Sequence, residues 1–319
     1  MKKSLVTILI LLAVVVIVAV VMADYRSTRP GRRPSNPFAY DVKEFRSVPG
    51  ELIGWRETGQ MEIDRSPAQA MTFRNGMLYL VAGGELQIID HNWNRVMRKS
   101  LDPDPVCISV TGEGRIVIGY ADRIELMRPD GELLAQSGSL GERVSITSVA
   151  ELDGSIYAAD AAGRIVRIFS GELEQTGEFS GDSGVSEVHG FIVPGGHFSL
   201  AVNEENELWI ANPGLHVMQN YTPAGRLRSY IGSSSFDIHG FSGCCNPVHF
   251  EFIPGGFVTS EKGIIRVKVI KESGELESVV APSEKFDGGT RAPAVAVDDD
   301  GNILLLDFDR NMLRIFEPS

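Results

Sequence analysis

The sequence has few cysteines: Cys107, Cys244 and Cys245 are the only ones among 319 residues. Small secreted domains that depend on disulfides show a larger, even set of cysteines at regular spacings. This chain does not belong to that class, so its stability must come from a sizeable hydrophobic core.

Positive charge is also scarce, with 30 Lys and Arg residues against 42 Asp and Glu residues and a net charge of -12. Proteins that bind nucleic acid need a basic stripe to contact phosphates, so nucleic acid is excluded as a partner. The chain also lacks a long amphipathic helix, a Walker loop, a dinucleotide-binding fingerprint and a Ser-His-Asp signature. These absences argue against nucleotide-dependent enzymes and serine hydrolases.

What the sequence does contain is a unit repeated six times, at intervals of roughly 40 to 50 residues. Each unit is an apolar strand, a Gly-containing turn, a second apolar strand, a short break, a third strand and a polar turn. Residues 70–81 with 85–90 form one copy, and residues 300–307 with 311–316 form the last. A strand meander of this kind cannot bury its apolar face alone, whereas radially packed copies can.

The repeats therefore predict an all-β, six-bladed β-propeller with four-stranded blades over residues 50–319. The last copy stops after its third strand, close to Ser319. We expect the missing outer strand to come from the other end of the domain, from residues 52–57 and 60–63.

The last copy also carries a family resemblance. Residues 293–307 run Pro, apolar strand, Asp-Gly-Asn, apolar strand, Asp, and this pattern resembles an NHL repeat. The resemblance covers about residues 50–319 and implies one four-stranded blade per repeat. NHL-type propellers include protein-binding scaffolds, lactonase-like hydrolases and a zinc-dependent lyase, so the resemblance implies the fold but not one function.

The N-terminus precedes the propeller. Residues 1–23 hold Lys2, Lys3 and then an uncharged run of about 20 residues, which predicts a single transmembrane anchor. A cleaved signal peptide is the alternative, although its apolar region is typically shorter. Residues 24–49, rich in Arg and Pro, predict an extended tether. We expect a cell-membrane protein with the propeller on the extracytoplasmic side.

Candidate site residues occupy the loops that lead into the first strand of each blade, here called leading loops. In a common register, Cys107, His197 and His249 fall at similar depth in three blades. Zinc takes such nitrogen and sulfur ligands, so the three are a candidate metal set. Glu187 or Asp237 is the candidate base if the site is catalytic. The alternative is that all three are ordinary packing residues.

Two further features lie in the leading loops of blades four and five. The tripeptide His-Gly-Phe occurs at His189 and again at His239, which indicates either blade duplication or a shared site. Cys244 and Cys245 are adjacent. They could form a strained, labile disulfide, bind a soft metal such as zinc or copper together with a histidine, or be two unrelated thiols.

Other polar residues are expected to be structural. Residues 298–301 predict a turn rather than a calcium loop, because the spacing of an EF-hand is absent. Asp160, Asn212, Glu261 and Asp307 end second strands and are expected to hold turns.

Three functions remain open from the sequence. The favoured one is a membrane-tethered propeller that binds a protein or a small ligand. The alternatives are a zinc-dependent propeller metalloenzyme and a redox or metal-handling protein built on the loop cysteines and histidines. The sequence does not decide whether the chain is an enzyme, and it favours a binding protein.

Overall fold

The computed structural model describes residues 2–27, 44–101, 105–182, 190–287 and 291–319. The chain divides into two compact units, residues 1–42 and 43–319. The first unit contains one helix, α1 (Lys2–Ser27). Among the residues that the structure describes, no helix is long and apolar enough to cross a membrane, so the transmembrane anchor expected over residues 1–23 is not supported.

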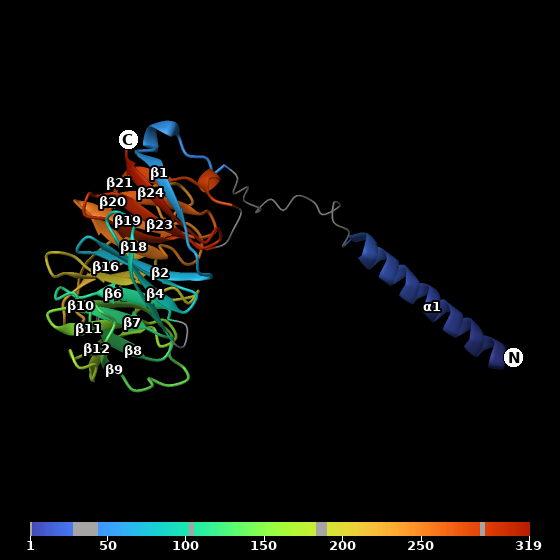
Figure 1. Ribbon diagram of the computed structural model, residues 1–319. Coiled ribbons are helices and arrows are strands. Elements are labelled where there is room, and N and C mark those ends of the chain that lie inside the picture. The colour runs from blue at the N-terminus through green and yellow to red at the C-terminus, as the bar shows by residue number, and fades with distance from the viewer. Residues whose placement is uncertain (1, 28–43, 102–104, 183–189, 288–290) are drawn as a thin grey trace. The chain divides into compact units, whose positions relative to one another are not determined.

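The described part of the second unit forms six four-stranded antiparallel sheets, and Figure 1 shows them as the blades of a propeller. Blades one and two are β2 (Ala68–Arg74), β3 (Met77–Ala82), β4 (Glu85–Asp90), β5 (Arg95–Ser100), and β6 (Cys107–Val110), β7 (Ile116–Gly119), β8 (Ile124–Met127), β9 (Leu133–Gln136). Blades three and four are β10 (Ile146–Leu152), β11 (Ser155–Asp160), β12 (Ile165–Phe169), β13 (Gln175–Phe179), and β14 (Leu200–Val202), β15 (Leu208–Asn212), β16 (Val217–Tyr221), β17 (Leu227–Ile231). Blades five and six are β18 (His249–Ile253), β19 (Gly256–Glu261), β20 (Arg266–Lys271), β21 (Leu276–Ala281), and β22 (Ala294–Val297), β23 (Ile303–Asp307), β24 (Met312–Pro318), β1 (Trp55–Glu62).

The sixth blade closes as expected. β1 pairs antiparallel with β24 from Trp55 opposite Pro318 to Glu62 opposite Met312, so the N-terminal strand is its outer strand. The Arg314 guanidinium donates to the Glu57 carboxylate at 2.8 Å and adds a charged contact to this closure. The six-bladed architecture and its closure, both predicted from the repeats, are confirmed.

Burial explains why the strands differ in composition. Central strands are covered on both faces by neighbouring blades and are mainly apolar, as in β15, where every residue is buried. Outer strands such as β5 are largely exposed. The core consists of apolar clusters at the interfaces between neighbouring blades, such as Trp209, Phe250 and Phe257 between blades four and five. Each interface is thus a thin core of its own.

The predicted turn at residues 298–301 is also present. The Asp298 carboxylate accepts hydrogen bonds from the backbone N–H groups of Asp300 and Asn302, which makes it a turn-forming side chain.

Candidate functional site

The first strands of the six blades contact one another in sequence and line the centre of the propeller. Because strands alternate in direction within a blade, the leading loops lie at the same end as the turns between second and third strands. We call this end the mouth.

Hydroxyl groups of one blade hold the leading loop of the next blade. Thr147 Oγ1 donates to the Phe198 carbonyl at 2.7 Å, Ser199 Oγ to the Val248 carbonyl at 2.6 Å, and Ser260 Oγ to the Pro293 carbonyl at 2.6 Å. The first two acceptors adjoin His197 and His249. Sequence analysis missed these hydroxyls, which fix the backbone beside both histidines.

The residues that end the second strands hold the leading loops from within each blade. In the leading loops, the Ser145 N–H donates to the Asp160 carboxylate and the Ile192 N–H donates to the Asn212 amide oxygen. The Ser242 N–H likewise donates to the Glu261 carboxylate. Their expected structural role is confirmed.

The structure brings two of the predicted residues together at the mouth, His197 and His249. Their ring centroids are 6.4 Å apart, and the His249 ring lies 6.2 Å from the ring of Phe308. Burial lowers the pKa of His249 to about 3, with smaller contributions from His197 and Arg291. Burial and the charges of Lys262 and Arg291 also hold the pKa of His197 below its usual value. Both rings are therefore neutral at pH 7 and offer one donor and one acceptor each.

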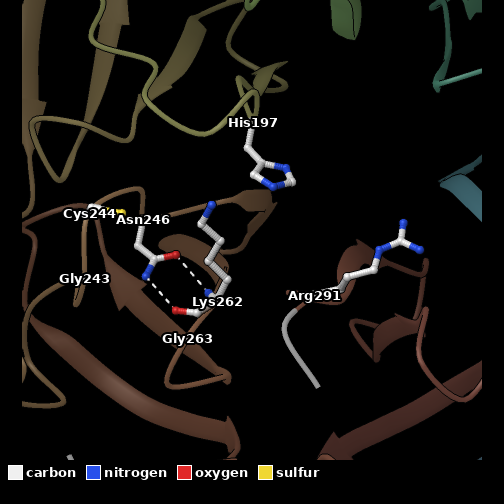
Figure 2. Close-up of a pocket in the computed structure, with 7 residues that line it drawn as sticks. All are labelled: His197, Gly243, Cys244, Asn246, Lys262, Gly263 and Arg291. Atoms are coloured by element: carbon white, nitrogen blue, oxygen red, sulfur yellow. Dashed lines mark hydrogen bonds between the residues drawn. The ribbon is translucent and has the colours of Figure 1, made fainter. Parts of the chain in front are cut away.

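A cavity of about 470 Å³ opens beside His197, lined also by Cys244, Asn246, Lys262 and Arg291 (Figure 2). We call it the mouth cavity. Asn246 fixes the backbone of Lys262, because its amide donates to the Lys262 carbonyl at 3.0 Å and accepts from the Lys262 N–H at 2.9 Å. Gly195 lets the Lys262 ammonium approach, since a Cβ at that position would lie 2.7 Å from Nζ.

Arg291 reaches the mouth cavity from the leading loop of blade six, and its guanidinium lies 4.1 Å from the ring centroid of Phe308. This cation–π contact gives the side chain a platform. Within the described residues, neither Lys262 nor Arg291 forms an ion pair with a carboxylate. The mouth cavity therefore presents two positive charges that no described carboxylate neutralises, in an acidic protein.

Cys107 does not join the histidines. It is buried in the apolar cluster between blades two and three, with Ile146 and Val149, and its position opposite Gly119 leaves room for the sulfur there. Burial raises the pKa of its thiol to about 12. The prediction that three residues project alike at the mouth is therefore wrong for Cys107, which faces a neighbouring blade.

Cys244 and Cys245 are free thiols in the structure, with their sulfur atoms 3.0 Å apart. Cys244 lines the mouth cavity, whereas Cys245 is buried. Burial, followed by the neighbouring Cys244, raises the pKa of the Cys245 thiol. The disulfide and redox interpretations of this pair stay predictions.

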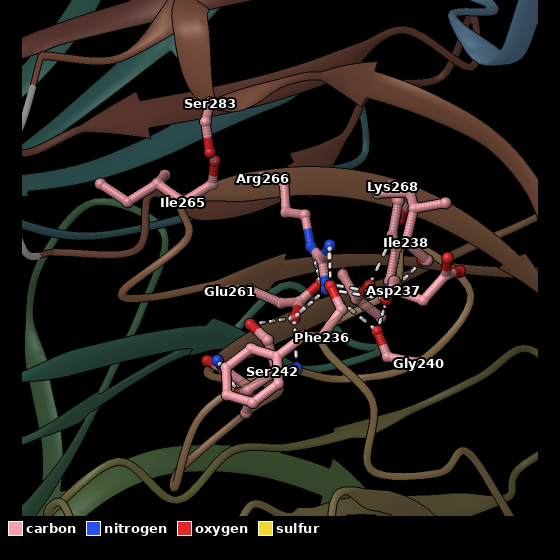
Figure 3. A network of polar contacts seen from close by, with 12 residues as sticks. Phe236, Asp237, Ile238, Gly240, Ser242, Glu261, Ile265, Arg266, Lys268 and Ser283 are labelled. Carbon is pink, nitrogen blue, oxygen red and sulfur yellow. Dashed lines mark hydrogen bonds and ion pairs between the residues drawn. The ribbon is translucent and has the colours of Figure 1, made fainter. Parts of the chain in front are cut away.

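His239 lies away from the mouth cavity, on an exposed loop. Its ring is 2.5 Å from the Asp237 carboxylate, and the backbone and side chain of His239 both lower the pKa of Asp237. Asp237 is therefore a weak base, held on the surface. Its loop is fixed from below by Arg266 and Lys268, which donate to carbonyl oxygens of residues 236–240 (Figure 3). His189 and Glu187 lie outside the described residues.

Over the same described ranges, no group of three or more His, Cys, Asp or Glu side chains is placed to hold a metal ion together. The candidate set does not fit a three-ligand zinc site, and the expectation of zinc or copper stays a prediction.

Comparisons with known proteins bear on the fold. No family model and no curated protein matches the sequence. A streptogramin B lyase structure is similar, with a TM-score of 0.57 and 11% identity over 83% of this chain and 98% of that chain. A structure of virginiamycin B lyase from Staphylococcus aureus has a TM-score of 0.56 and 10% identity, over 83% of this chain and 100% of that chain. A protein of unknown function from Bacteroides caccae has a TM-score of 0.54 and 12% identity, over 72% of this chain and 85% of that chain.

At these identities the likeness shows the propeller fold alone. The resemblance to NHL repeats stays a prediction, because no family model supports it.

Sequence analysis missed one more channel residue, Glu251, two positions beyond His249 on the same face of β18. Its carboxylate accepts only the N–H of Phe252, at 2.9 Å, among the described contacts. Burial raises the pKa of Glu251 to about 7, against a smaller opposing effect of Arg74 in blade one. The alternation His-Phe-Glu along the first strand was the available signal.

Proposed function

We propose that this propeller is a binding scaffold that holds a small organic anion, bearing a carboxylate or a phosphate, in the mouth cavity. The observation that carries the proposal is the pair Lys262 and Arg291, two cations that line one cavity without a carboxylate partner among the described residues. Arg and Lys at such sites bind carboxylate and phosphate through charge-assisted hydrogen bonds.

The neutral histidine of the mouth cavity suits the same ligand. His197 lines the cavity between the two cations and keeps a directional N–H donor and an acceptor at pH 7. An anion with a neighbouring hydroxyl or carbonyl group would use the cations for its charge and the imidazole for its orientation. The cavity volume of about 470 Å³ matches a small ligand.

Binding is favoured over turnover because the mouth cavity offers no strong base. Among the described residues its lining contains no carboxylate, and the low pKa of the adjacent His249, about 3, makes that imidazole a poor proton acceptor.

The proposal also places the propeller at a membrane surface, on its extracytoplasmic side. The support is the apolar run between Lys3 and Asp24, whose described large side chains are at least 50% exposed along α1, such as Leu12 and Val15 at 61% and 66%. Apolar surface of this extent is stabilised by contact with lipid. Membrane fractionation of the full chain and of residues 44–319 tests this. Recovery of both in the soluble fraction would overturn it.

The anion proposal is tested by calorimetric titration of the full-length chain with inorganic phosphate, citrate and acetate. We expect at least one to bind, and Lys262→Ala and Arg291→Ala each to weaken that binding about tenfold. Arg226→Ala is the matched control, because this exposed arginine follows a turn at the opposite end of blade four. No binding by any of these anions, or equal binding by all variants, would overturn the proposal. Elemental analysis of the same sample tests for zinc or copper.

A further inference from the structure

A second cavity lies between blades four and five, at the end of the propeller opposite the mouth. Its volume is about 280 Å³. The turns that contribute to it join β14 to β15 and β20 to β21, so alternating strand direction places it away from the leading loops. We call it the far cavity. It shares no lining residue with the mouth cavity.

Aromatic side chains form one part of the far cavity. Trp209, Phe252 and Phe257 line it, with the rings of Trp209 and Phe257 4.8 Å apart and those of Phe252 and Phe257 5.4 Å apart. The three rings come from two blades and are held by the apolar cluster at that interface. They give the cavity a rigid wall whose π faces attract cations rather than anions.

Hydrogen-bond acceptors form the other part. Within the described residues the Glu272 carboxylate forms no ion pair, and its side chain lies at the exposed rim. Glu207 is fixed in place, since its Oε2 accepts from Asn203 Nδ2 at 3.1 Å and from Trp209 Nε1 at 3.2 Å. Its Oε1 is 3.7 Å from a guanidinium nitrogen of the exposed Arg228, which offsets part of the charge.

The most telling group is Asn220. Its side chain is 3% exposed and lines the far cavity, yet its Oδ1 has no hydrogen-bond partner among the residues that the structure describes. Leaving a buried acceptor without a donor is unfavourable, and such groups are rare in folded proteins. An N–H donor from a ligand in this cavity would satisfy it.

From this combination we infer that the far cavity binds a small organic cation with N–H donors, an alkylammonium or alkylguanidinium group. The aromatic wall stabilises the charge, the two glutamates neutralise it, and Asn220 Oδ1 accepts one N–H. The volume admits a group of this size and excludes large ligands. The cation is either a free amine or the side chain of a lysine or arginine in a peptide.

The test uses the full-length chain and ligand-observed NMR saturation transfer. The probes are n-butylammonium and n-propylguanidinium, with n-butanol as the neutral analogue and capped tripeptides with a central lysine or arginine. We expect a cationic probe to bind and n-butanol not to bind. Stronger binding of the tripeptides would identify a protein side chain as the ligand, and exclusive binding of the small probes would identify a free amine.

Two variants locate the binding. Glu272→Gln removes one charge at the rim and should weaken the binding of the cationic probe about fivefold. Asn220→Val removes the unpaired acceptor at similar volume, so it should weaken binding by a similar factor while the melting temperature stays equal or rises. Glu277→Gln is the control, because this exposed glutamate lies on β21 outside the cavity lining.

Three results would overturn the inference: no cationic probe binds at about 10 mM, n-butanol binds as well as n-butylammonium, or Glu272→Gln and Glu277→Gln behave alike. If Asn220→Val fails to fold, the acceptor has a structural partner, which contradicts its assignment, and the charge test with Glu272→Gln still stands on its own.

Discussion

Lys268 and Lys262 lie close together in blade five, yet their surroundings differ. Lys268 is 1% exposed, and its ammonium contacts the Glu261 carboxylate at 3.1 Å and the carbonyls of Ile238 and Gly240 (Figure 3). Lys262 is half-buried at the mouth cavity, and no described carboxylate pairs with it. A charge removed from water must be paired, whereas a charge beside a cavity can keep water until a ligand replaces it.

The two arginines show the same contrast. Arg266 is 1% exposed and donates to both oxygens of Glu261, at 2.9 and 3.1 Å. Arg291 is exposed and rests on an aromatic ring instead. The buried cations hold the fold of the His239 loop, and the mouth cations are available to a ligand. Each prediction below changes one side of this comparison.

The largest effect is expected for Glu261→Gln. Burial would raise the pKa of Glu261, but the nearby charges of Lys268 and Arg266 hold it below its ordinary value. Burial lowers the pKa of Lys268 to about 8. Removing the carboxylate charge leaves Arg266 and Lys268 buried without a counterion, which should cost about 3–5 kcal/mol of the free energy of unfolding. Urea denaturation measures this.

Glu277→Gln is the control and should stay within about 0.5 kcal/mol of the parent chain. A loss below about 1 kcal/mol for Glu261→Gln would show that the buried network does not depend on its carboxylate.

Much of this arrangement followed from the sequence, and the reason is periodicity. The repeats fixed the blades, the closing strand and the structural acids at the ends of second strands, because burial on two faces imposes a regular pattern. The pairing of His197 with His249 followed from matching loops. Cys107 did not follow, because one position along a first strand decides between the channel and a neighbouring blade.

The cations of the mouth cavity were invisible for a different reason. Lys262 and Arg291 are ordinary surface residues in sequence, and only the structure shows that no described carboxylate reaches them. One signal was present: Lys262 directly follows Glu261, the residue that ends a second strand, and thus begins a turn at the mouth.

A smaller effect is expected for Glu251→Gln, which tests a partly buried carboxyl that forms no ion pair with a described residue. Burial raises its pKa from the ordinary value of 4.5 to about 7 in the folded protein, so the folded state binds the proton more tightly. The stability that the folded protein gains from holding this proton is fully present below pH 4.5 and is lost as the pH rises through about 7. Glu251→Gln should therefore be more stable than the parent chain at pH 8, by roughly 1–3 kcal/mol, and similar at pH 4.

His249 has the opposite effect on how stability changes with pH. Its pKa is lowered from 6.5 to about 3, so stability should fall as the pH drops below 6.5. Urea denaturation from pH 4 to pH 8 separates the two groups. A Glu251→Gln profile parallel to that of the parent chain would contradict the assignment to Glu251.

The mouth cations should contribute little to stability. Lys262→Met and Arg291→Met each remove an unpaired charge while keeping an apolar chain, so we expect changes within about 0.5 kcal/mol in urea denaturation. Lys268→Met is the matched buried variant and should differ clearly, since the Ile238 carbonyl loses its lysine donor and the Gly240 carbonyl keeps only the donor from Arg266. Equal destabilisation by Lys262→Met and Lys268→Met would mean that the mouth lysine is a structural residue too.

The smallest effect is expected at Phe308, whose ring supports the Arg291 guanidinium at 4.1 Å. Phe308→Leu keeps the apolar packing but removes the π face, so Arg291 loses a contact of about 0.5–1 kcal/mol and samples more conformations. Anion binding in the mouth cavity should then weaken about two- to fivefold, measured by calorimetric titration, with Phe308→Tyr binding as the parent chain does. If Leu and Tyr variants bind alike, the ring does not position Arg291, and the mouth arginine reaches its ligand as a freely moving surface charge.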